Sequence, residues 1–94
     1  MQSGLIMSPE LETLDQLLGG DLPGKVIRSN YKDADAFKRG VLGLLVEGDI
    51  CLLTSDQVVV PKWRWSAMFD RMTGFTEVDE MLLRITTKGA RRIG

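Results

Sequence analysis

Residue types that could do chemistry are few in this chain of 94 residues. It has no histidine and one cysteine, so Ser-His or Cys-His catalysis, a histidine-ligated metal and a disulfide within the chain are all excluded. Cys51 stands between Ile50 and Leu52, which favours a small buried side chain over a nucleophile. No glycine-rich phosphate loop or dinucleotide-binding fingerprint is present. We therefore expect the chain to have no catalytic residue, cofactor or metal ion, and we expect that it is not an enzyme.

Carboxylates are numerous, but they do not cluster with a substrate-binding loop as acid/base catalysis requires. We expect these carboxylates to be solvated: Asp33, Asp35, Glu47, Asp49 and Asp56.

Charge is distributed unevenly along the chain. Residues 1–60 hold five basic and nine acidic residues and residues 61–94 hold seven and four, so the segments carry −4 and +3 within a net charge of −1. This balance excludes a uniformly basic coat, yet the second segment could neutralise phosphates. An ordinary solvated surface is the alternative interpretation. The candidate residues for binding nucleic acid or a protein partner are Lys62, Trp63, Arg64, Arg71, Arg84, Lys88, Arg91 and Arg92.

Two tryptophans lie two residues apart, which directs their side chains to different faces of a helix or strand. Trp65 is in helical phase with Met68, Phe69 and Met72, so we assign it to the core and Trp63 to the surface. An exposed indole is either a partly covered surface group or an interface hot spot.

Two helices must support these groups. Ser8 and Pro9 start a helix over residues 8–18, with leucines at helical spacing before Gly19. A second helix covers residues 33–47 and ends at Gly48. Its interior glycines, Gly40 and Gly43, are explained by close packing against a neighbouring element. We expect the first helix to pack on the second, or on its copy in a partner chain.

The connecting segments are less determined. Residues 21–24 read as a turn, and residues 25–28 fit either a short strand or a helical turn. Residues 50–53 and 58–60 fit a hairpin, which β-branched propensity favours, whereas residues 54–57 also fit a capping box that opens a short helix. Residues 62–73 form a helix, residues 75–78 and 81–86 form paired strands, residues 88–89 end the second of these, and residues 90–93 form a frayed basic end.

From residue 41 onward the order helix, short strand, optional helix, helix and hairpin resembles a winged helix-turn-helix domain. Residues 41–50 (VLGLLVEGDI) are similar to the opening helix of the phenolic-acid-regulator and MarR-like group, residues 68–75 (MFDRMTGF) to the end of a recognition helix, and residues 81–89 (MLLRITTKG) to a returning wing strand. The resemblance implies an α+β fold, mostly helical with a β-hairpin wing, in which residues 62–73 are the recognition helix and residues 75–86 the wing.

Two functions follow as expectations. One is a small DNA-binding regulator that contacts duplex DNA, with a homodimer formed through the helix of residues 8–18. The other is a non-enzymatic protein-protein interaction module, an inhibitor or adaptor that acts by surface binding. We expect residues 1–7 to be a disordered lead, residues 8–94 a single domain, and the location cytoplasmic, because no segment has the length or flanks of a membrane span or signal peptide.

Overall fold

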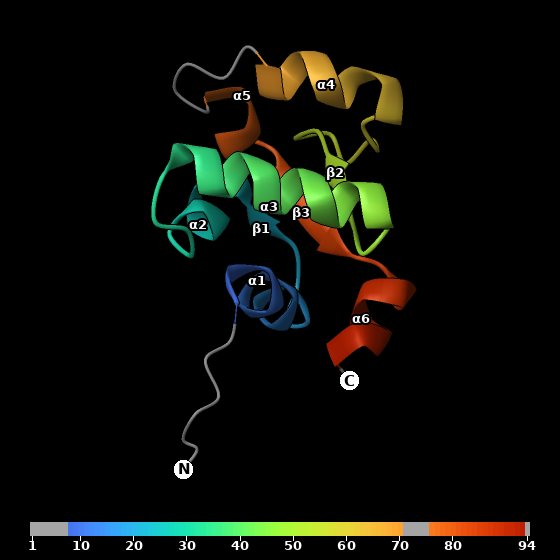
Figure 1. The fold of residues 1–94 in the computed structure, drawn as a ribbon. Helices are drawn as coiled ribbons and strands as arrows, with labels where there is room; N and C mark the ends of the chain where they lie inside the picture. The colour runs from blue at the N-terminus through green and yellow to red at the C-terminus, as the bar shows by residue number, and fades with distance from the viewer. Residues whose placement is uncertain (1–7, 71–75, 94) are drawn as a thin grey trace.

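The computed structural model describes residues 8–70 and 76–93, and Figure 1 shows helices packed around a small sheet. In chain order the elements are α1 (Pro9–Leu17), β1 (Leu22–Pro23), α2 (Gly24–Arg28), α3 (Ala34–Glu47), β2 (Ile50–Leu53), α4 (Lys62–Asp70), α5 (Thr76–Asp79), β3 (Leu82–Ile85) and α6 (Thr87–Ile93). The fold is therefore α+β, as predicted.

Helices α1 and α3 begin and end where their local signals predicted. The Ser8 hydroxyl accepts the N–H of Leu11 at 3.2 Å, which satisfies one otherwise unpaired donor of the first turn of α1. Asp33 caps α3 in the same way, accepting the N–H of Ala36 at 2.8 Å. Gly48 ends α3 in the left-handed conformation, with φ of 80°.

The sheet has three antiparallel strands in the order β1-β3-β2, so the last strand in sequence lies in the middle. Leu83 of β3 faces Leu52 on one side and Leu22 on the other. Pro23 is on an edge strand, where its missing N–H removes no bond from a central ladder.

One hydrophobic core joins helices and sheet. Leu14 and Leu17 of α1 pack with α3 within the same chain, as one of the two expected arrangements has it. Buried side chains of α4 and α5 extend this core to the other side of α3, above it in Figure 1. The largest fully buried side chains are Phe37, Phe69, Leu14, Leu17, Ile27, Leu45, Leu52, Leu53, Leu83, Val41, Val60 and Val78.

The predicted hairpin wing of residues 75–86 is wrong. Residues Thr76–Asp79 form helix α5, and β3 pairs with β1 and β2. The physical reason is burial: Val78 is fully buried against α2, where a Cβ on Gly24 would overlap its carbonyl oxygen. A strand at this position would remove Val78 from the core.

The C-terminal prediction is also wrong, because residues 87–93 form helix α6 instead of a frayed end after a break at residues 88–89. Gly89 lies inside α6, and its lack of a Cβ lets the helix lie against the backbone carbonyl of Asp49. This tertiary contact outweighs the weak helix propensity of glycine.

The shorter connections resolve the remaining alternatives. Residues 21–24 were predicted as a turn, but Leu22–Pro23 within them form strand β1. Residues 25–28 are helical, as part of α2. The capping-box helix at residues 54–57 is absent. Instead, the N–H groups of Gln57 and Thr54 bond the carbonyls of Thr54 and Val58, and Leu53 bridges Val59, which is close to the hairpin alternative.

Candidate functional site

Three of the predicted binding residues already form hydrogen bonds or ion pairs with other residues of the same chain. Arg84 forms a forked contact with Asp21, with its Nε 3.1 Å from each carboxylate oxygen and a second nitrogen 2.7 Å from Oδ2. These hydrogen bonds hold the pKa of Asp21 below its ordinary value. Lys88 donates to the backbone carbonyl of Glu47 at 2.6 Å, and Arg92 lies 2.9 Å from Asp49.

The other predicted residues are not gathered on one face. Lys62, Trp63 and Arg64 are on α4 and Arg91 is on α6, and Figure 1 places these helices at opposite ends of the molecule. Arg71 lies outside the described residues. The six basic candidates that the structure describes therefore do not make one continuous cationic surface.

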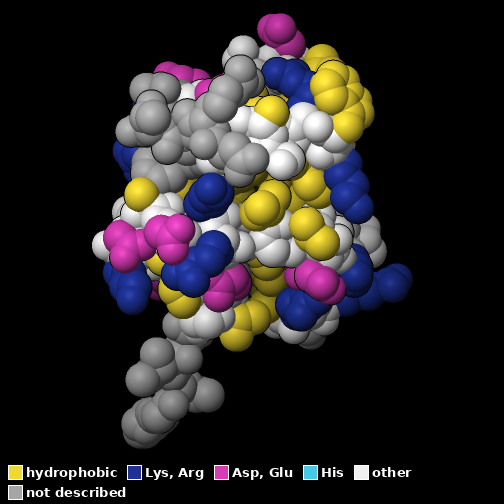
Figure 2. Space-filling model, turned by 45° about the horizontal axis from the view of Figure 1, so that its top comes forward, with side chains coloured by type: hydrophobic (Ala, Val, Ile, Leu, Met, Phe, Trp, Pro, Cys, Tyr) yellow, Lys and Arg dark blue, Asp and Glu magenta, His cyan; other side chains and the backbone are white. Residues whose placement is uncertain are grey.

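The assignment of the two tryptophans is confirmed. Trp63 is 79% exposed, whereas Trp65 is partly buried against the core and its indole N–H donates to the carbonyl of Val60 at 3.2 Å. Val58 and Val59, in the loop that leads into α4, are also exposed. Figure 2 shows hydrophobic side chains next to basic ones at the upper right of the molecule, at the end where α4 begins.

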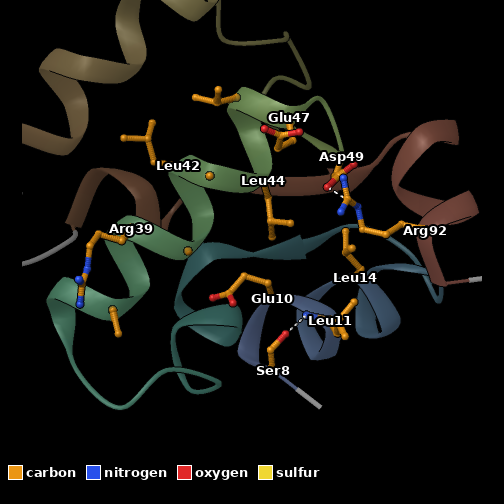
Figure 3. A pocket seen from close by; sticks show the side chains of 14 residues that line it. Ser8, Glu10, Leu11, Leu14, Arg39, Leu42, Leu44, Glu47, Asp49 and Arg92 are labelled. Carbon is orange, nitrogen blue, oxygen red and sulfur yellow. Dashed lines mark hydrogen bonds and ion pairs between the residues drawn. The ribbon is translucent and has the colours of Figure 1, made fainter. Parts of the chain in front are cut away.

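A groove of about 880 Å³ lies between α1 and α3. Figure 3 shows Leu11 and Leu14 on its α1 side, Leu42 and Leu44 on its α3 side, and Arg92 at one end. We call this surface the α1/α3 groove. Its lining residues are Ser8, Glu10, Leu11, Leu14, Ala36, Arg39, Gly40, Leu42, Gly43, Leu44, Val46, Glu47, Asp49 and Arg92.

The two interior glycines of α3 differ. A Cβ on Gly40 would overlap the ring of the buried Tyr31 and approach Glu10, so the predicted close packing is confirmed there. A Cβ on Gly43 would meet no atom within 4 Å, so the same explanation is wrong for Gly43. Gly43 is exposed in the groove, next to Leu42 and close to Val46, which is 57% exposed.

The prediction for one of the carboxylates is wrong: Asp49 was expected to be solvated, but it is 1% exposed. Its backbone carbonyl accepts bonds from the N–H and hydroxyl of Thr86, and one carboxylate oxygen pairs with Arg92. The other oxygen, Oδ1, has no hydrogen-bond partner among the described residues. The clue in the sequence is its position between a helix-ending glycine and the buried Ile50.

Charge on the groove rim is mixed. Arg39 pairs with Asp35 at 3.1 Å and Arg92 pairs with Asp49, so these cations are already matched. Glu10 and Glu47 also line the groove. Together with the arginines and the leucines, they make it an apolar surface with a charged margin.

Sequence reasoning missed this groove because it followed only the buried face of the helix at residues 33–47. Leu42 and Val46 are four residues apart and therefore form a second apolar stripe, on a side of α3 different from that of Phe37 and Val41. That spacing was the available signal.

Comparisons with protein-family models, curated proteins and solved structures found no match to this chain. Among the described residues, no helix is both long enough and apolar enough to cross a lipid bilayer. Within the same residues, no group of three or more acidic or cysteine side chains is arranged to hold a metal ion.

Proposed function

We propose that this chain is a non-enzymatic protein-interaction module whose docking surface is the α1/α3 groove. The observation that carries the proposal is the apolar, solvent-open face of α3 formed by Leu42, Gly43 and Val46. Exposed apolar surface beside a polar rim is typical of sites where another protein binds.

The order of the elements supports a winged-helix-like scaffold in a different part of the chain from the one predicted. Helix α1, strand β1 and helices α2 and α3 are followed by β2 and β3, which pair with each other. The order helix, short strand, helix, helix and paired strands thus begins at Pro9 rather than at residue 41. Residues 54–81, with α4 and α5, stand between the two paired strands.

In a helix-turn-helix the second helix is the one that enters the major groove of DNA, led by its N-terminal residues. Here that helix is α3. Its first turn is capped by Asp33 and contains Asp35, which would repel phosphates, and Arg39 is already paired with Asp35. Further along, its outer face is apolar. The chemistry of α3 therefore favours a protein partner over DNA.

An amphipathic helix is one kind of partner segment that fits this surface. A groove between two helices accepts the apolar face of a third, and Gly43 leaves room for a backbone to approach closely. Basic residues on the polar face of that helix would lie near Glu10 and Glu47.

A peptide-display selection on the immobilised chain tests this proposal. We expect selected peptides to carry apolar residues at i, i+3 or i+4, and i+7. Val46→Glu should weaken their binding at least about tenfold, because it places a charge in an apolar contact. Val26→Glu is the matched control, since Val26 is an exposed valine on α2 outside the groove. Equal binding to the parent and to Val46→Glu would refute the proposal.

A DNA-binding regulator is the second candidate function, and exposed Lys62 beside Trp63 on α4 is the observation in its favour. A gel shift with a random duplex at low salt tests it, because such a regulator has non-specific affinity there. If it binds, replacing Lys62 and Arg64 by alanine should flatten the dependence of log affinity on log salt by roughly one unit for each lost phosphate contact. Absence of a shift with the parent chain removes this candidate.

A further inference from the structure

Two surfaces of this molecule are complementary to each other. The α1/α3 groove is concave and apolar and has two glutamates, Glu10 and Glu47, among its lining residues, whereas the start of α4 is apolar and basic. We propose that the occupant of the groove is a second copy of this chain, which inserts the side chain of Trp63. This inference rests on the proposed function, because it names the partner of the same groove.

The surface at the start of α4 consists of Lys62, Trp63 and Arg64, and we call it the Trp63 knob. Among the described residues, its indole is the most exposed of the large hydrophobic side chains, at 79%. Lys62, before it, is exposed, and Arg64, after it, is partly exposed. A rigid aromatic side chain flanked by cations is the kind of group that forms a hot spot in an apolar pocket with carboxylates on its rim.

The groove is large enough for this knob. It is open to solvent rather than enclosed, and its volume of about 880 Å³ leaves room for an indole side chain. An indole in the groove would cover apolar surface of the leucines that line it. Its flanking cations would then lie near the rim glutamates, Glu10 and Glu47.

The knob cannot fill the groove of its own chain. Helix α4 lies on the opposite side of α3 from α1 (Figure 1), and none of its residues lines the groove. The net charges of the two segments also favour contact between chains, because residues 1–60 carry −4 and residues 61–94 carry +3. The groove belongs to the acidic segment except for Arg92, and the knob belongs to the basic one.

Association of this kind is head-to-tail. Each bound pair leaves one groove and one knob unoccupied, so further copies can add and the assembly has no fixed size unless it closes into a ring. A single indole with two flanking side chains covers less than the roughly 1,600 Å² of a standard stable interface, so the contact should be weak and concentration-dependent. Salt should weaken it further because both charged margins are exposed.

Sedimentation velocity on the full chain tests the proposal through a pair of complementary variants. The parent should increase in mean mass from about 10 µM to about 1 mM, a range suited to a weak interface. Trp63→Ala removes the knob and Val46→Glu blocks the groove, so each alone should associate at least about 30-fold more weakly. Mixed in equal amounts, they should form a dimer and nothing larger, because only one intact knob and one intact groove remain to meet.

Matched controls separate this contact from general stickiness. Leu18→Ala and Val26→Glu change exposed apolar residues outside both surfaces and should leave the association of the parent unchanged. Circular dichroism of every variant verifies folding, and Lys62→Glu provides a second knob variant that should weaken association at low salt.

Three results would overturn the inference: a parent that stays monomeric, a Trp63→Ala variant that associates like the parent, or a mixture that forms no dimer. Its failure is distinguishable from failure of the proposed function. If the parent is monomeric but selected peptides still require Val46, the groove binds another protein and only the second copy is excluded. If the peptides bind Val46→Glu as well as the parent, the proposed function itself fails.

Discussion

Gly43→Ala should make the protein more stable and its groove less able to bind. Glycine inside a helix costs about 1 kcal/mol relative to alanine, and the new methyl group would meet no atom within 4 Å. The free energy of unfolding should therefore rise by about 1 kcal/mol, which corresponds to about 4–8 °C in Tm for a domain of this size. Peptide binding and self-association should both weaken, because the methyl group occupies the point of closest approach.

Gly40→Ala is the matched comparison, three residues earlier on the same helix. Its Cβ would overlap the ring of Tyr31, which is buried and packs edge-on against Phe37 with ring centroids 5.6 Å apart. Because that ring has little room to move, overpacking should cost about 1–3 kcal/mol and outweigh the gain in helix propensity. The two alanine variants should thus change stability in opposite directions.

Urea unfolding followed by tryptophan fluorescence measures both variants against the parent, with equal m values as the condition for comparing midpoints. A destabilised Gly43→Ala would mean that the face of α3 at this position is covered in solution. A neutral or stabilised Gly40→Ala would mean that Tyr31 does not pack against α3 as described. Higher stability of Gly43→Ala with unchanged binding would refute the role given to Gly43 in docking.

Three further outcomes are expected. Urea melts should show Trp65→Ala destabilised by roughly 2–4 kcal/mol, because a partly buried indole and its hydrogen bond are lost. Trp63→Ala should change the free energy of unfolding by less than about 0.5 kcal/mol. The reverse order would contradict the helical phase of α4. Because Arg84 lowers the pKa of Asp21, the pair stabilises the fold above the ordinary value of 3.8 and this contribution is lost as pH falls through the lowered pKa. Arg84→Met should therefore lower the urea midpoint at pH 6 and lose its effect in strong acid, whereas an equal effect at both pH values would exclude the ion pair. Burial raises the pKa of Tyr31, the only tyrosine, to about 12, so an ultraviolet titration of the protein should have its midpoint there. The free energy of unfolding should fall as pH rises from about 10 to about 12. A midpoint near 10 would mean that the ring is exposed.

Local rules were sufficient for the features that depend on neighbours in the sequence. Ser8, Asp33 and Gly48 mark the ends of α1 and α3 through bonds that span three or four residues. The phase of α4 follows from helical spacing alone, which is why Trp63 and Trp65 were assigned correctly. None of these features requires knowledge of which distant segments meet.

The sheet could not be predicted in the same way. Its central strand, β3, pairs with a two-residue strand about sixty residues earlier, and that strand contains Pro23, which lowers its strand propensity. Residues 75–78 were predicted as the first strand of a hairpin, but Val78 is buried against Gly24 instead. Such choices depend on long-range burial, for which a local pattern carries no information.

Chemistry, rather than the order of elements, decides between the two candidate functions. A winged-helix-like arrangement can present its second helix to DNA or to protein, because a fold does not fix what binds to it. Lysine or arginine at positions 42 and 46 would provide cations for phosphates, whereas this chain has Leu42 and Val46 there, around the unfilled Gly43. Leu42 is partly buried against the core, whereas Val46 is 57% exposed, and apolar surface that lies open to water lowers solubility unless a partner covers it. This apolar surface in the groove is therefore the strongest reason to expect a protein in it.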